Sequence, residues 1–495
     1  MNPILVTGVI VGYFLVLVLV ARWVSRPSQR PDRRTDFAGF KSGIPWFVVA
    51  FGMIGTSLSG VTFISVPGDV GALTADLPQQ PKGMIYFQIV IGYLLGYVFI
   101  ALVLLPFYYR QNNRSIYSNL EHRLGNWAPR VAAGFFMVAR LFGSSVRLFL
   151  TLSLLYTLFY ANSFIAFEVF AALSLVLVYL YSSKSGLNAI VWTDTIQTLI
   201  FLSVLLYLLV YFGNYLGWDI LQTSRYTQLV EWDIDRSHFV GKSLLAGFLI
   251  CVAMTGLDQD MIQKSLMCKS LRQAQLNLLV FAGLLLAANL LFLLLGVLLY
   301  EFAAARQLTV PQSTDLLLPE IMIQHLDRLS PLLLLLGLVS SSASSVDGTI
   351  AALSTTYTEN FSRTRQPDRF RQRMTYLAFA ALILLVIITF HYMSGGHAQF
   401  NVITLILSTA SFIYAPIVAL FLLYMLPGKR PPRVNGWSFG ILVLAAFASY
   451  GLIRYANSVM SYQIGFESIA IGSVLAYVAL RIQSYILQNK IQEQK

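Results

Sequence analysis

The segment covering residues 332–357 carries the side chains best suited to chemistry. As a helix it is long and apolar enough to cross a bilayer, yet its middle holds five serines and Asp347. Ser340, Ser344 and Asp347 follow one another at i, i+4 and i+7, so they share one helix face. The serines alone leave open the alternative that they only serve close helix packing. Asp347 favours an ion or substrate path, and such oxygen ligands suit a small, hard cation.

The composition places these residues in a membrane protein. The chain has 495 residues, of which 57% are hydrophobic and 11% charged, and its mean hydropathy is +0.68. These values are typical of a polytopic membrane protein and exclude an ordinary soluble enzyme. The net charge of +12 sits mainly in short loops between apolar segments, so it indicates topology rather than nucleic-acid binding. Two cysteines imply no disulfide framework.

The sequence predicts about thirteen transmembrane helices. The apolar segments cover residues 3–25, 45–66, 84–109, 131–160, 163–182, 188–214, 240–258, 275–302, 329–356, 374–393, 399–426, 436–454 and 463–485. The loops alternate between basic and nearly uncharged, and the basic ones include the segment 264–272. This alternation predicts a multi-pass protein of the cell inner membrane, with its N-terminus outside and a cytoplasmic tail at 486–495. The first segment lacks signal-peptide features, so we expect it to be retained.

Two of the predicted spans look interrupted. In segment 45–66 and just beyond it, Gly55, Gly60 and Pro67 break an apolar run that also carries hydroxyl side chains. In segment 240–258 the corresponding positions are Gly247 and Thr255-Gly256. Broken helices at membrane depth are tolerated where the freed backbone lines a cavity, and such a pair indicates an inverted-repeat transporter. For either span alone, glycine-mediated helix packing explains the pattern equally well.

Several motifs give the chain a resemblance to a known family. They are RSIYSNLEHRLG (114–125), IVWTDTIQ (190–197), DQDMIQKSLMCKS (258–270), STDLLLPEIM (313–322) and LVSSSAS (338–344). In this order and topology they resemble the sodium/solute symporter family, which includes sodium-coupled sugar, proline, pantothenate and sialic acid transporters. The resemblance covers residues 1–485, as a single transmembrane domain. It implies an all-α LeuT-type fold with inverted five-helix repeats at 45–214 and 240–426, the helix 3–25 before them and two helices within 436–485 after them.

The resemblance also implies a sodium site. Its ligands are the carbonyl oxygens of Gly55, Leu58 and Gly337 and the hydroxyls of Ser340 and Ser341. Asp194 matches the acidic residue that lies near sodium in relatives.

The same helix leaves open a second sodium site or another role in coupling. Some relatives hold a second sodium with two further hydroxyls, of which Ser344 matches one while Ala343 occupies the other. Ser345 or Asp347 could compensate for the missing hydroxyl, together with Asp194.

The solute-binding positions implied by the resemblance come from four spans. They are Ser57, Ser59, Thr62, Gln88, Cys251, Thr255 and Ser408. At Thr62 the sugar transporters of the family have a glutamine, and this chain is similar to the sialic acid branch there.

Arg140 and Arg147 lie within the fourth predicted span. A buried guanidinium binds a carboxylate through two parallel hydrogen bonds, so either arginine would suit an anionic solute. The alternative is an internal ion pair with Asp194 or Asp347.

These observations predict a sodium-coupled symporter that imports a small polar organic solute by alternating access. A carboxylate such as a sugar acid or sialic acid is one interpretation of the solute, and a neutral sugar or an amino acid is the alternative. We expect sodium as the coupling ion, the solute and the bilayer as partners, and neither nucleic acid nor an obligate protein partner. A membrane enzyme using magnesium at Asp258, Asp260 and Asp347, or a transporter-like sensor, is disfavoured, so we expect no enzymatic activity.

Overall fold

The computed structural model describes residues 3–24, 44–74, 77–111, 115–160, 165–182, 186–236, 238–327, 329–362, 369–394, 402–426, 433–459 and 468–493. These residues form helices and a short antiparallel hairpin, β1 (Leu73–Thr74) with β2 (Leu77–Pro81).

The helices follow one another along the chain with short connections. They are α1 (Pro3–Val24), α2 (Trp46–Ser57), α3 (Gly60–Asp69), α4 (Tyr86–Phe99), α5 (Leu105–Gln111), α6 (Glu121–Leu124), α7 (Trp127–Phe159), α8 (Phe167–Ser182), α9 (Gly186–Leu216), α10 (Ile220–Thr223), α11 (Val240–Cys251), α12 (Gln259–Leu266), α13 (Leu271–Ala305), α14 (Leu317–Glu320), α15 (Ser330–Asn360), α16 (Arg369–Met393), α17 (Val402–Met425), α18 (Trp437–Val459) and α19 (Ser468–Glu493). Single turns of π- or 3-10 helix lie at η1 (Ile100–Leu104), η2 (Ile116–Leu120), η3 (Val252–Gly256), η4 (Thr314–Leu316) and η5 (Ile321–His325).

The number of membrane spans agrees broadly with the prediction. Among the described residues, nine helices are long and apolar enough to cross a membrane, and up to eleven if each of two bent pairs is one span. The shorter apolar helices Phe167–Ser182 and Phe412–Met425 lie in the fifth and eleventh predicted segments. The prediction of an all-α, multi-pass protein is therefore confirmed, whereas the count of about thirteen spans stays a prediction.

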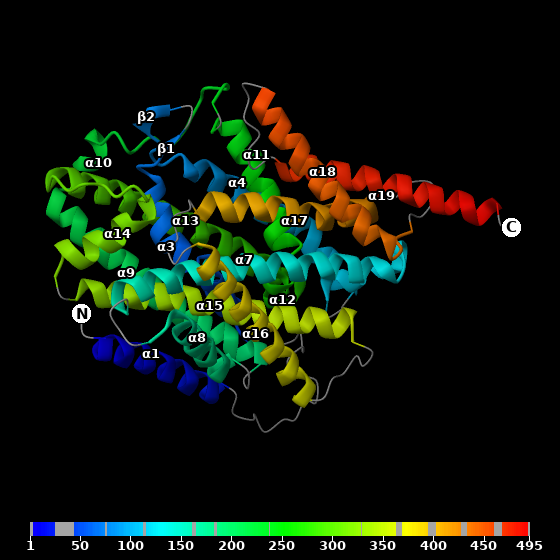
Figure 1. Cartoon of the computed structure of the whole chain (residues 1–495), viewed down its shortest axis with the longest axis horizontal. Coiled ribbons are helices and arrows are strands. Elements are labelled where there is room, and N and C mark those ends of the chain that lie inside the picture. Colours follow the sequence, from blue (N-terminus) through cyan, green and yellow to red (C-terminus); the bar gives the residue numbers. More distant parts are fainter. Residues whose placement is uncertain are drawn as a thin grey trace.

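Helix α15 lies at the centre of the bundle. In its spanning window 89% of the residues are buried, against 28% in α1 and 17% in α18. It packs against α2, α3, α7, α9 and α16, while the long helices α7, α13 and α15 run along the long axis (Figure 1). The serine-rich helix is thus enclosed by protein on all sides, as a polar function within the membrane requires.

The first bent pair, α2 and α3, turns by 66° at Leu58 and Ser59. Leu58 (φ −89°, ψ 110°) and Ser59 (φ −98°, ψ 173°) have extended backbones. The Ser59 N–H, which would continue α2 by binding the Gly55 carbonyl oxygen, instead donates to Thr62 Oγ1 at 3.3 Å. The break therefore falls between the predicted glycines, but the predicted interruption at Pro67 is wrong, because Pro67 lies inside α3.

The second bent pair turns by 67° between Val240–Gly256 and Gln259–Leu266. Asp258 has an extended backbone at the break, and its carboxylate caps α12 by accepting hydrogen bonds from the N–H groups of Asp260 (2.9 Å) and Met261 (3.4 Å). The span therefore continues past its predicted end at residue 258.

Gly247 is not a break point. It lies inside α11 and faces α4, where an added Cβ would come within 2.1 Å of the Ile89 carbonyl oxygen and 3.0 Å of the Gly92 Cα. At this position the alternative of glycine-mediated packing is correct, because only glycine lets the two backbones approach so closely.

Candidate functional site

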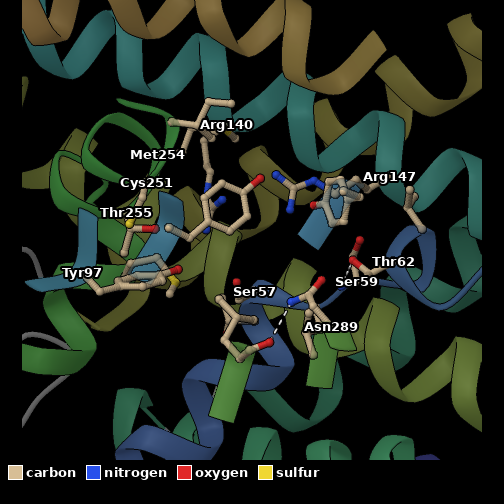
Figure 2. A pocket seen from close by; sticks show the side chains of 18 residues that line it. Ser57, Ser59, Thr62, Tyr97, Arg140, Arg147, Cys251, Met254, Thr255 and Asn289 are labelled. Atoms are coloured by element: carbon tan, nitrogen blue, oxygen red, sulfur yellow. Dashed lines mark hydrogen bonds between the residues drawn. The ribbon is translucent and has the colours of Figure 1, made fainter. Parts of the chain in front are cut away.

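A cavity with a volume of about 160 Å³ opens beside the first break (Figure 2). Its lining is drawn from the end of α2, the break itself, α3, α4, α7, α11 with η3, α12 and α13. The lining residues are Thr56, Ser57, Leu58, Ser59, Val61, Thr62, Tyr86, Tyr93, Tyr97, Arg140, Arg147, Ile250, Cys251, Met254, Thr255, Met261, Leu285 and Asn289. Most of the predicted solute-binding positions are therefore brought together around one cavity, and their contacts with the solute stay a prediction.

Two predicted solute-binding positions are not among these residues. The Gln88 amide donates to the carbonyl oxygens of Ile85 (3.3 Å) and His238 (3.2 Å) and accepts from the Glu231 N–H (3.2 Å). It thus ties α4 to the loop before α11, and the geometry gives no support for solute contact. Ser408 lies in α17, but its side chain is outside the described part of the chain.

The two arginines differ in their partners. Arg140 is 5% exposed; its Nη2 lies 2.5 Å from Asp260 Oδ2 and its Nε 3.5 Å from Asp258 Oδ2. Arg140 therefore forms an internal ion pair, as the alternative predicted, but with Asp258 and Asp260 and not with Asp194 or Asp347. Arg147 also points into the cavity (Figure 2), and among the described residues its guanidinium has no ion pair and its Nε no hydrogen bond. Arg147 is therefore the cavity's uncompensated positive charge.

The first break lies directly against the serine-rich helix. An added Cβ on Gly55 would lie 2.8 Å from Ser344 Oγ, and one on Gly60 would lie 2.8 Å from Ser342 Oγ. One on Gly337 would meet the Phe63 ring of α3 at 3.0 Å. These three contacts place residues 337–344 of α15 opposite Leu58 and Ser59.

Oxygen atoms suited to a cation are available at this junction. Within the described part of the chain, Ser340 Oγ is buried without a hydrogen-bond partner. Ser341 Oγ donates to the Gly337 carbonyl oxygen at 2.8 Å, which leaves its lone pairs to accept a cation. The N–H that would bind the Gly55 carbonyl oxygen is diverted at the break. The predicted ligands therefore fit a hard monovalent cation such as sodium, and their assignment stays a prediction.

A buried charge cluster adjoins the junction. Asp194 of α9 accepts a hydrogen bond from Ser344 (2.7 Å) at one carboxylate oxygen and binds Lys264 Nζ (2.8 Å) at the other. Thr56 of α2 donates to the second oxygen at 3.2 Å and accepts a hydrogen bond from Lys264. Asp194 and Lys264 are both 0% exposed. The prediction that Lys264 begins a cytoplasmic loop is wrong, because it lies inside α12.

Asp347 faces away from the cavity. Its carboxylate accepts hydrogen bonds from Tyr181 Oη of α8 (2.7 Å) and from the Gly348 N–H (2.6 Å). Ser345 is also buried, and its carbonyl oxygen accepts from Thr349. A coupling role of Asp347 or Ser345 would thus not act through the cavity wall.

Sequence reasoning missed Asn289. Its side chain lines the cavity, and its Nδ2 donates to the Leu285 carbonyl oxygen at 2.8 Å (Figure 2). The available signal was a lone amide within the apolar run of α13, since polar side chains are costly inside a span.

Comparison with known sequences identifies relatives along most of the chain. Residues 37–430 match the family described as the Sodium:solute symporter family. The sodium/sialic acid symporter SiaT of Proteus mirabilis (strain HI4320) is 20% identical over 95% of this chain and 93% of its own length. The sodium-coupled monocarboxylate transporter 2 of Mus musculus is 24% identical over 76% of this chain, which spans 60% of the mouse protein.

Solved structures show the same architecture. A Na⁺-coupled sialic acid symporter in a substrate-bound, outward-open state superposes with a TM-score of 0.75 at 17% identity, covering 97% of this chain and 98% of that one. A transporter of the nucleobase-cation-symport-1 family in a closed conformation has a TM-score of 0.54 at 13% identity, covering 93% and 96%. The fold is therefore the LeuT-type transporter fold.

Proposed function

Because the chain belongs to the sodium:solute symporter family, and is thus a multi-pass, sodium-coupled transporter, we propose that the solute it imports is a small organic carboxylate. The observation that carries this proposal is the difference between the two arginines. Arg140 is neutralised by Asp258 and Asp260, whereas Arg147 places an unpaired guanidinium at the cavity. Arg147 is half-buried, with its Nε shielded from solvent. An anionic solute would pair with this guanidinium through two parallel hydrogen bonds.

The rest of the cavity fits a solute with polar groups beyond the carboxylate. Hydroxyls from Ser57, Ser59, Thr62 and Thr255 and the amide of Asn289 supply donors and acceptors. The relatives named for sialic acid and for monocarboxylates support the proposal, since both names denote carboxylic acids. A neutral sugar remains the alternative.

We further propose that residues 45–214 and 240–426 are the two inverted repeats, each opened by one of the bent pairs. Sodium at the first break and α15 stabilises the outward-facing, solute-ready arrangement, and loss of the carbonyl contacts releases it inside. The Arg140 bridge to α12 closes the inner side of the cavity in the first arrangement. The coupling free energy comes from the different affinities of the two arrangements.

The proposal involves transport without an enzymatic reaction. Of the three carboxylates that a membrane enzyme would use with magnesium, Asp258 and Asp260 both bind Arg140, whereas Asp347 binds Tyr181. Among the described residues, no three His, Cys, Asp or Glu side chains converge as metal ligands.

A thermal-shift comparison of purified protein tests the solute class. Gluconate, sialic acid and lactate are each paired with a neutral counterpart (glucose, sialic acid methyl ester and lactamide), in sodium chloride or choline chloride. We expect a carboxylate to raise Tm only with sodium, because a ligand at about 100 times its Kd stabilises the folded state by about 2.7 kcal/mol. Stabilisation by glucose with no response to any carboxylate would reject the proposal and favour the neutral-solute alternative.

We also propose that the N-terminus lies outside the cell and the C-terminus in the cytoplasm. The alternating basic loops support this, and α1 begins and α19 ends at opposite ends of the long axis (Figure 1). A membrane-impermeant maleimide applied to intact cells should label Asp235→Cys but label His122→Cys only after permeabilisation. The parent protein is the control, since Cys251 and Cys268 are 3% and 1% exposed. Equal labelling of both sites from outside would contradict this topology.

A further inference from the structure

The side chain of Lys264 is buried among oxygen atoms of neighbouring helices, although the sequence predicts a basic loop at this residue. Its Nζ lies 2.8 Å from Asp194 Oδ2 of α9 and 3.8 Å from Asp260 Oδ1 of its own helix, and it donates to Thr56 Oγ1 of α2. The backbone of α15 closes over it, because a Cβ on Gly348 would lie 3.1 Å from Nζ. The ammonium is thus enclosed by oxygen atoms at the meeting point of four helices.

The same surroundings contain the residues that matched a second sodium site. Asp194 holds Ser344 through one carboxylate oxygen and Lys264 through the other, while Ala343 supplies no side-chain oxygen. An ammonium and a sodium ion are both monovalent cations that bind oxygen, so they compete for one carboxylate. Like charges repel, and the repulsion is only weakly screened in a buried site, so the ammonium disfavours a sodium ion at the same carboxylate.

We propose that Lys264 is a tethered cation that takes the place of a second sodium ion, so that this transporter binds one sodium per cycle. The ammonium neutralises Asp194 permanently and joins α12, α9 and α2 without drawing an ion from solution. The inference rests on sodium coupling, and it is independent of whether the solute is a carboxylate.

Counting bound sodium tests the inference without any solute. Equilibrium dialysis of purified full-length protein against ²²Na⁺, with choline chloride holding the ionic strength, gives the number of ions bound per chain. We expect one ion and a Hill coefficient of about one for the parent protein. Two ions bound with Lys264 intact would overturn the proposal, whatever the behaviour of the variants.

Two changes should restore the second site. Lys264→Gln with Ala343→Ser removes the ammonium and adds a hydroxyl beside Ser344, so we expect two bound ions and a Hill coefficient above one. Lys264→Arg retains the positive charge and should bind one ion, as should Lys269→Gln, which removes an exposed lysine just beyond α12. A folded double variant, judged by size-exclusion chromatography and circular dichroism, that still binds one ion would also overturn the proposal. If the double variant does not fold, the parent count decides.

Discussion

Replacing Arg147 should abolish tight solute binding while leaving sodium binding intact. In Arg147→Gln the cavity loses the positive charge that would pair with the solute carboxylate. Truncating one partner of a charge pair that is buried in a complex costs about 2–5 kcal/mol. The solute concentration at half-saturation should therefore rise by roughly 30-fold to several thousand-fold. Arg147→Lys keeps the charge but removes the planar fork, and loss of one charged hydrogen bond should cost roughly 10- to 150-fold. Uptake in proteoliposomes at saturating sodium measures both effects.

Controls for this prediction come from the same helix. Arg130→Lys changes an exposed arginine of α7 and should leave uptake unchanged. Arg140→Gln should act differently, because it removes the guanidinium that pairs with both Asp258 and Asp260 and should lower stability by about 3–5 kcal/mol. Parent-like uptake of a carboxylate by both Arg147 variants would contradict the assignment.

Removing the Ser341 hydroxyl should weaken sodium binding by roughly 5- to 150-fold. Losing one oxygen ligand is comparable to losing a hydrogen bond to a charged group, which costs about 1–3 kcal/mol of binding free energy. Ser341 Oγ lies 2.8 Å from the Gly337 carbonyl oxygen, so both oxygens can face one ion beside the first break. Serine and alanine are similar in size, and folding should survive. The measurement is the sodium dependence of uptake at saturating solute, for Ser340→Ala and Ser341→Ala.

Two further serines of α15 make this test specific. Ser354→Ala is the control, because Ser354 is a buried serine near the other end of the helix. Ser342→Ala tests the register of the ligands, since Ser342 Oγ lies beside Gly60 just past the break. A shift with Ser342→Ala but not with Ser340→Ala or Ser341→Ala would show that the ligand register is wrong. No shift with any of the three would reject the site.

The sequence predicts the broken spans well but places their breaks only approximately. Glycine and hydroxyl patterns locate the first break because both favour an interrupted helix. The position itself depends on hydrogen bonds such as Ser59 N–H to Thr62 Oγ1 and the Asp258 cap of α12. At Gly247 the same glycine pattern reflects helix packing, and local sequence cannot separate these two uses.

The charged residues show where sequence reasoning ends. Lys264 resembles a loop residue because a buried lysine needs a partner, and its partner Asp194 is far away in the chain. Arg140 and Arg147 are equivalent in the sequence, since both lie on one span at helical spacing. They differ only because the second break brings Asp258 and Asp260 against one of them.

The contact between α4 and α11 has a consequence for how the transporter moves. Cβ atoms added at Gly92 and Gly96 would come within 2.4 Å of the Leu244 carbonyl oxygen and 2.6 Å of Cys251 Cβ, so the two backbones touch over successive turns. Backbones interlocked in this way cannot slide past each other, and we expect α4 and α11 to travel as one rigid body. Shear must then occur where contacts are made by side-chain ends that can part and re-form, as between α7 and α12. The cavity-lining tyrosines of α4 (Tyr86, Tyr93 and Tyr97) should then stay fixed relative to α11 through the cycle, while α7, which carries Arg140 and Arg147, moves relative to them.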